Sequence, residues 1–205
     1  MHPKVLSSDA WSVVRRLAAA GLLDGWTLAG GTGMALQFGH RYSEDLDFFR
    51  AQDFDPVELI DQLARLGHVE VQARSAGTLH AKLDRLRLAF LKMQAPFLFP
   101  GTPYRGLVVA DLRDIAVLKL IAIGGRGSRK DFVDLFFYLR SGGSLDTVFA
   151  LLRERLPAVE YNEHDLLKSL VYFDDAEGEP MPRMISDVSW AEVKAAIVDE
   201  VKRLS

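Results

Sequence analysis

The chain has 205 residues, which suffices for the core of one large domain or of two small domains in contact. Its 25 Lys and Arg residues against 28 Asp and Glu residues give a net charge of -3, so the chain as a whole produces no positive field, and nucleic acid must bind a local patch. The lack of cysteine excludes disulfides and thiolate metal sites, and the lack of a secretion signal or of an apolar run of roughly 18 residues predicts a cytoplasmic protein with no membrane partner.

The first half of the chain is expected to alternate helices and strands. Ser7 or Ser8 can cap the first helix, which ends near Gly21, and Gly39 can end the second helix. Helices are predicted over residues 8–20, 32–38 and 56–66, and strands over residues 26–29, around 46–48, over 69–73 and within 78–93, with a turn near residues 84–85. These patterns indicate an α/β first half.

The prolines and the glycine of residues 96–103 break this pattern and predict a boundary between a domain of residues 1–103 and a domain of residues 104–205. The second domain is expected to be mainly helical. Asp111 can cap its first helix, which the Gly124-Gly125 pair interrupts, and Ser128 can cap the next helix. Further helices are predicted over residues 145–155, 163–170 and 190–204.

Residues 30–49 join a glycine pair at a predicted helix start to two carboxylates on a predicted strand. Free amides at the helix N-terminus, beginning with Gly30 and Gly31, suit a phosphate group. Asp45 and Asp47 are alternate residues of the strand, so they share one face about 7 Å apart and can hold Mg²⁺ over one bound phosphate chain. The alternatives are a tight turn without a ligand and a pair of acidic caps.

The apolar character of the strand favours the metal interpretation. Leu46, Phe48 and Phe49 make the strand too apolar for a solvated edge, so Asp45 and Asp47 would be buried without compensation unless a cation binds them. Two Mg²⁺ ions about 3.5–4 Å apart can activate an attacking hydroxyl and stabilise a leaving pyrophosphate.

Three stretches of the sequence resemble one protein family. The runs Gly-Gly-Thr-Gly-Met-Ala-Leu, Gly-His-Arg and Ser-Glu-Asp-Leu-Asp-Phe-Phe resemble the AbiEii family of nucleotidyltransferase-like toxins, relatives of the MenT toxins in the polymerase-β-like superfamily. Asp-Ile-Ala-Val-Leu-Lys-Leu-Ile-Ala-Ile and Arg-Gly-Ser-Arg-Lys-Asp-Phe-Val-Asp-Leu are similar to the second conserved block of that family. Residues 172–177, with Pro180, Pro182 and Trp190, resemble a subgroup of short members.

The resemblance implies an α+β fold, with a nucleotidyltransferase-like mixed sheet and flanking helices, followed by a mainly helical C-terminal half that completes the active-site cleft. It implies an enzyme that uses Mg²⁺, or Mn²⁺ in its place, to transfer a nucleoside monophosphate from a nucleoside triphosphate (NTP) to an acceptor hydroxyl. RNA, including tRNA, is the expected acceptor, and a cognate antitoxin protein is an expected partner. A role in a toxin–antitoxin system or in phage defence follows by analogy only.

The resemblance also implies roles for individual residues. In the family the Asp-x-Asp pair binds metal, so Asp45 and Asp47 are the expected metal ligands and, with Lys119 and Asp131, the expected catalytic residues. The expected nucleotide-binding residues are Gly30, Gly31, Thr32, Arg41, Ser43, Lys119, Arg126, Lys130 and Asp134.

Reasoning from the residues leaves alternatives for several of these roles. Lys119 can be a surface lysine that snorkels to solvent, and the charged residues of 130–134 can form a solvated, salt-bridged face. Arg41 can contact a phosphate or pair with Glu44, and Ser43 can bind beside the metal or close a turn.

The general base is unassigned. Many polymerase-β-like enzymes place a third carboxylate on a neighbouring strand, whereas residues 86–93 contain Arg87 and Lys92 and no acid. Asp84 lies at the predicted turn, Asp131 or Asp134 can reach the site from the helical half, and transfer without a protein base is also possible.

Two other functions remain open. A degenerate fold could bind nucleotide or a protein partner without transfer, and an antibiotic-modifying enzyme could use a small hydroxylated acceptor. Basic residues at a predicted hairpin can form a local RNA-binding patch: Lys82, Arg85, Arg87 and Lys92. His2, His68, His80 and His164 lack zinc-binding spacing and are expected to be ordinary polar residues.

Overall fold

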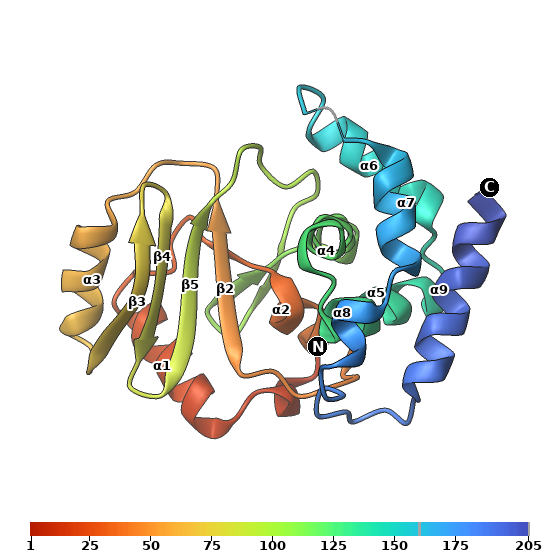
Figure 1. Ribbon diagram of the computed structural model, residues 1–205. Coiled ribbons are helices and arrows are strands. Elements are labelled where there is room, and N and C mark those ends of the chain that lie inside the picture. The colour runs from red at the N-terminus through yellow and green to blue at the C-terminus, as the bar shows by residue number, and fades with distance from the viewer. Residues whose placement is uncertain (160, 205) are drawn as a thin grey trace.

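The computed structural model describes residues 1–159 and 161–204. Residues 160 and 205, which belong to the expected helical domain, lie outside the described residues. Figure 1 shows a sheet on one side and a group of helices on the other, with α2 (Gly30–Phe38) and α4 (Leu112–Arg126) between them. This arrangement confirms the expected α+β fold. Within the described ranges, no helix is long and apolar enough to cross a membrane.

Seven strands of the described chain form one mixed sheet. They are β1 (Thr27–Leu28), β2 (Asp45–Arg50), β3 (Val69–Ser75), β4 (Thr78–Leu83), β5 (Leu86–Lys92), β6 (Thr102–Tyr104) and β7 (Leu107–Val109). They lie side by side in the order β3-β4-β5-β2-β1-β7-β6. β2 is central, because it pairs in parallel with β5 and antiparallel with β1.

β6 and β7 were not expected from the sequence. Leu28 of β1 pairs in parallel with Val109 of β7, so the sheet continues past the boundary expected at residue 103. Strands of three residues are too short to show alternation, and Pro103 is typical of a loop. Proline is tolerated here because β6 forms an edge of the sheet.

The helices cover both faces of the sheet. α1 (Ser8–Ala19) and α3 (Pro56–Ala64) pack on one face, and α2 and α4 lie on the other. The remaining helices are a 3-10 turn (Pro3–Val5), α5 (Arg129–Arg140), α6 (Leu145–Arg155), α7 (Glu163–Val171), α8 (Asp174–Glu177) and α9 (Trp190–Leu204).

The caps explain where the helices begin and end. The Ser7 hydroxyl accepts from the Ala10 amide at 3.1 Å, and Asp111 accepts from the Arg113 amide at 2.9 Å, as the capping signals predict. The expected interruption at the second glycine pair is wrong, because α4 continues to Arg126. A Cβ on Gly124 would overlap the Leu166 side chain, so this glycine allows α7 to pack closely on α4.

Alternation along β2 separates a core face from a polar face. Leu46 and Phe48 are buried in the core beneath α1 and α3. Asp45, Asp47 and Phe49 therefore point to the opposite face, toward the helical half.

A buried cluster of charged side chains ties α4, α5 and the loop before β2 together. Asp134 of α5 lies at its centre and is fully buried. The Arg41 guanidinium donates to both Asp134 oxygens at 2.7 and 2.8 Å, and the Lys119 ammonium lies 2.6 Å from one of them. Lys119 also donates to Asp131 at 2.7 Å, and the His40 Nε2 lies 2.8 Å from Asp134.

The charges of this cluster compensate one another. Burial by itself raises the pKa of Asp134, but the positive charges of Arg41 and Lys119 outweigh burial and hold that pKa well below the ordinary range. Burial lowers the pKa of Lys119, and Asp134 and Asp131 more than reverse this effect. Both partners therefore remain charged in the interior.

We expect Asp134→Asn to lower the free energy of unfolding by about 3–5 kcal/mol, because Arg41 and Lys119 would stay buried without their shared carboxylate. Urea unfolding followed by circular dichroism measures the change. Asp61 is an exposed carboxylate on α3 and provides the control, since Asp61→Asn should change the free energy by less than about 0.5 kcal/mol.

The same measurement against pH checks the sign of the effect. Because the pKa of Asp134 is lower in the folded protein, its stabilisation is complete above the unfolded value of about 3.9 and is lost as pH falls through the folded value. Equal stabilities of the unmodified protein and Asp134→Asn at pH 7 would contradict the structural role of the cluster.

Candidate active site

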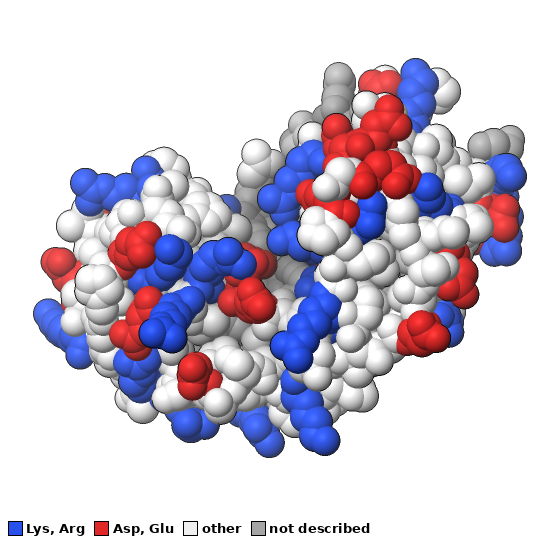
Figure 2. Space-filling view, turned by 60° about the horizontal axis from the view of Figure 1, so that its bottom comes forward, with Lys and Arg blue, Asp and Glu red and all other residues white. Residues whose placement is uncertain are grey.

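A cavity of about 600 Å³ lies between the polar face of β2 and the helical half. Figure 2 shows a hollow between two lobes, with acidic residues on one wall and Lys and Arg residues around it. The expected site residues that line the cavity are Gly30, Gly31, Thr32, Arg41, Ser43, Asp45, Asp47, Lys119, Arg126, Lys130 and Asp131. The fold therefore brings residues from both halves of the sequence to one cavity.

The glycine pair at the start of α2 permits two close approaches. Gly30 has a φ of +58°, and a Cβ on it would overlap the Asp47 carboxylate. A Cβ on Gly31 would overlap the Arg41 guanidinium. The pair is thus required by the side chains that converge on the first turn of the helix, which begins at residue 30 rather than at residue 32 as expected.

Asp47 is a partly buried carboxylate that has neither an ion pair nor a side-chain hydrogen bond within the described residues. Burial raises its pKa, and neighbouring Asp45 raises it further, against the opposing charges of Lys119 and Lys130. Asp47 therefore carries charge that the protein alone does not compensate.

Asp45 lies on the same face of β2 but has a partner. The Arg87 Nε donates to its carboxylate at 2.5 Å, and the Arg87 side chain is 53% exposed. The metal ligand expected at position 45 is thus paired with a half-exposed arginine, which a divalent cation could displace.

The donor set fits a hard divalent cation. The described residues contain no cluster of three or more metal-binding side chains. Mg²⁺ commonly binds through one or two carboxylates and completes its shell with water and substrate phosphates. Asp45 and Asp47 match that pattern, and the unpaired charge of Asp47 supplies a reason for a cation to bind there.

Lys119 lies at the floor of the cavity. It is 5% exposed and is held by Asp131 and Asp134, so the interpretation as a snorkelling surface lysine is wrong. Arg126 lies 3.7 Å from Asp131 and is 69% exposed at the rim. Lys130 lines the cavity and has no ion pair or hydrogen bond among the described side chains.

Four of the expected nucleotide-binding residues have partners within the protein. Arg41 lines the cavity and pairs with Asp134, not with Glu44. Asp134 is fully buried and does not line the cavity. Thr32 and Ser43 contact each other at 2.6 Å between hydroxyl oxygens and close the loop that leads into β2.

The cavity also contains residues that the sequence did not indicate. Arg183 reaches it because the Tyr42 amide donates to the Arg183 carbonyl at 2.9 Å, which joins two segments far apart in sequence. His80 of β4 and Arg87 of β5 face the same cavity. Alternation along β4 and β5 indicates which face of the sheet these two residues occupy. The order of the strands was needed to show that this face lines the cavity.

The expected basic patch at the β4–β5 hairpin is largely neutralised. Lys82 pairs with Glu70 at 3.1 Å, Lys92 with Asp53 at 2.7 Å, and Arg87 with Asp45. The positive charge that remains open to a polyanion gathers instead at the rim of the cavity, where Arg126 and Lys130 lie.

Comparison with known solved structures identifies the fold. MenT4, a nucleotidyltransferase toxin from Mycobacterium tuberculosis H37Rv, superposes with a TM-score of 0.58 at 15% identity, over 95% of this chain and 84% of MenT4. The antibiotic-resistance factor ANT(2″)-Ia superposes with a TM-score of 0.56 at 16% identity, over 77% of this chain and 98% of that protein. At these identities the likeness shows a shared nucleotidyltransferase fold.

Sequence comparison assigns the family. Residues 12–87 match the family model described as nucleotidyl transferase AbiEii toxin, type IV TA system. The uncharacterized protein aq_aa25 of Aquifex aeolicus (strain VF5) is 32% identical over 206 residues, which cover 96% of each chain. The chain belongs to the AbiEii family of nucleotidyltransferase toxins.

Proposed function

We propose that this nucleotidyltransferase uses Mg²⁺ to transfer a nucleoside monophosphate from an NTP to an acceptor hydroxyl of RNA, with tRNA among the candidates. The observation that carries the proposal is Asp47, a partly buried carboxylate without a partner among the described side chains, next to Asp45 and across a cavity from basic residues. A carboxylate in that state is suited to a divalent cation that arrives with a polyphosphate.

Two walls of the cavity, one at the start of α2 and one on the helical half, would bind the nucleotide. The start of α2 presents free amides to a phosphate, and Lys119 and Lys130 supply positive charge from the helical wall. When bound by Asp45 and Asp47, Mg²⁺ would supply Lewis-acid polarisation of the phosphates. Positive charge held rigidly near the leaving pyrophosphate stabilises the charge that develops there.

Asp131 and Asp134 act in the proposal as positioning residues. They hold the Lys119 ammonium at 2.7 and 2.6 Å, so the lysine is ordered before the nucleotide binds. Preorganised charge costs little reorganisation at the moment of reaction. Arg126, at the exposed rim, would contact the outer phosphates or the acceptor.

The nucleobase would lie against an apolar wall of the same cavity. This wall combines residues of the sheet with residues of α4: Phe49, Leu91, Leu118, Ile121 and Ala122. An aromatic ring and aliphatic side chains can pack on any base, which favours a site of low base selectivity.

The toxin role implies a restraining partner. We propose that a cognate antitoxin is encoded beside this chain, in line with the type IV toxin–antitoxin description of the matched family. We propose further that the protein acts in the cytoplasm and contributes to phage defence. Detection of free toxin activity only when that neighbouring gene is deleted would support this part of the proposal.

The second candidate is a nucleotide-binding module without transfer activity. One observation favours it. Arg87 lies on β5, the strand where related enzymes carry an acid, and its Nε donates to Asp45 at 2.5 Å. Binding of Mg²⁺ and NTP with no product from any RNA or small hydroxylated acceptor would favour it.

We expect Asp47→Asn to lower transfer of labelled nucleotide into RNA by at least about 100-fold, because the amide binds a divalent cation far more weakly than the carboxylate does. Purified protein, Mg²⁺, each α-³²P-labelled NTP in turn and total bacterial RNA provide the assay. Asp61→Asn on α3 is the control and should keep full activity. Equal transfer by Asp47→Asn and by the unmodified protein would refute the metal role of Asp47.

Stability provides an independent measurement on the same variant. Because the pKa of Asp47 is higher in the folded protein than in the unfolded chain, ionisation lowers the free energy of unfolding as pH rises through these values. At pH 7 in EDTA we therefore expect Asp47→Asn to melt at a higher temperature than the unmodified protein, with the difference shrinking toward acidic pH.

Mg²⁺ and NTP together should raise the melting temperature of the unmodified protein and not that of Asp47→Asn. A lower melting temperature of the variant in EDTA would show that the protein itself stabilises the Asp47 carboxylate, and it would remove the main reason for a metal ion there.

A further inference from the structure

The proposed reaction lacks an assigned proton acceptor, and the structure excludes two of the three expected acids. Asp84 pairs with Arg16 at 2.6 Å at the β4–β5 turn and does not line the cavity. Asp134 is fully buried and bound by Arg41. Asp131 lines the cavity, but it holds Lys119 on the helical wall, which is the side of the leaving phosphates in the proposal above.

The strand beside β2 carries no acid on this face, and it places an alanine next to Asp47. Asp47 of β2 pairs in register with Ala89 of β5, and Ala89 pairs in register with His80 of β4. These three residues form one row across the sheet and point to the same face. Because the middle residue is alanine, no side chain beyond Cβ separates the carboxylate from the imidazole.

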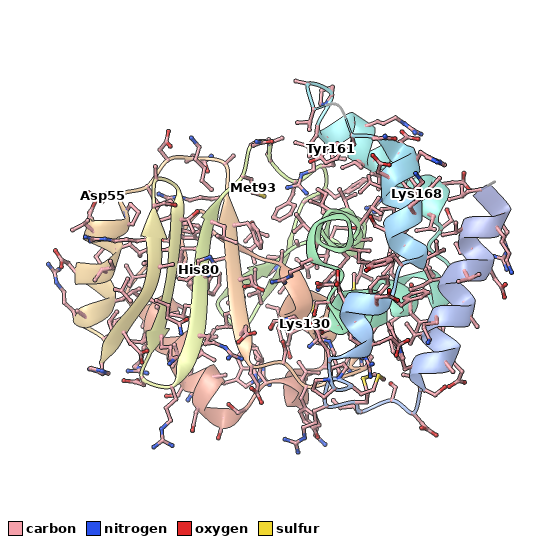
Figure 3. All side chains as sticks on the ribbon, viewed as in Figure 1. Asp55, His80, Met93, Lys130, Tyr161 and Lys168 are labelled. Carbon is pink, nitrogen blue, oxygen red and sulfur yellow. The ribbon has the colours of Figure 1, made fainter. Side chains whose placement is uncertain are left out.

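The geometry points to His80 as the general base for the acceptor hydroxyl, an inference that rests on the proposed function. Two strand spacings place the Cα atoms of Asp47 and His80 about 10 Å apart. Both side chains line the same cavity, so an acceptor hydroxyl bound there can reach the imidazole. In Figure 3, His80 lies on the sheet and Lys130 on the helical half, on the two sides of the cavity.

The surroundings of His80 suit this role. His80 lines the cavity, and none of its ring nitrogens has a hydrogen bond or an ion pair within the described part of the chain. His40, in contrast, is fully buried against Asp134 and is not available to a ligand. A half-buried imidazole with a free ring nitrogen can act as a proton acceptor for a bound hydroxyl.

The proposed step is balanced in atoms and charge. The acceptor hydroxyl gives its proton to a ring nitrogen of His80 while its oxygen forms a bond to the α-phosphorus of the NTP. The bond from that phosphorus to the bridging oxygen breaks, and pyrophosphate leaves with the electron pair. The imidazolium then returns the proton to solvent through the open cavity.

The test separates chemistry from binding. We expect His80→Gln to lower the single-turnover rate of transfer from α-³²P-labelled NTP to total bacterial RNA by about 100-fold or more, because glutamine cannot take the proton. The dissociation constant of Mg²⁺-NTP, from titration calorimetry, should change by less than about 3-fold, as expected for a group that acts on the acceptor. Added imidazole should restore part of the activity of His80→Ala.

The control is His68→Gln, an exposed histidine before β3 that does not line the cavity, and it should transfer at the unmodified rate. Melting temperatures of all variants show whether they fold. Transfer by His80→Gln within 3-fold of the unmodified protein would overturn the inference and leave the proposed function intact. So would a loss confined to NTP affinity, since it would make His80 a nucleotide contact. No transfer by the unmodified protein would instead refute the proposed function.

Discussion

The ion pairing of Asp134 is the interaction on which the site depends. One carboxylate of α5 receives the Arg41 guanidinium from the loop before β2 and the Lys119 ammonium from α4. Since a buried charge without a partner is costly, these three segments cannot separate without a large loss of stability. The same contacts place the strand with its acids against the helix with its lysine. The cavity is therefore built by the cluster beneath it.

The contrast between Asp134 and Asp47 distinguishes a structural charge from a functional one. Asp134 is fully buried and Asp47 is partly buried. Positive neighbours lower the pKa of Asp134, whereas burial raises that of Asp47. A fold that leaves one carboxylate uncompensated gives up stability at that position. Functional sites commonly lose stability in this way, because a group that must bind a cation or a substrate cannot have all its charge and hydrogen bonds satisfied by the protein.

The sheet contributes through its register rather than through any single motif. β2, β5 and β4 are adjacent, so residues that are far apart in sequence meet on one face. Ala89 lies between Asp47 and His80 in this row, and its own side chain ends at Cβ. The segment at Arg183 closes the other side through its backbone contact with Tyr42.

The sequence by itself determined the family, the α+β class and the pairing of Asp45 with Asp47 on one strand face, because these follow from short-range spacing and from local glycine, cap and alternation signals. It did not reveal β6 and β7, whose three-residue length leaves no pattern. Only the tertiary structure showed that Arg41 forms an ion pair with Asp134 and that His80 lines the cavity. Such outcomes depend on strand order and on which buried charges meet, and neither is encoded in local periodicity.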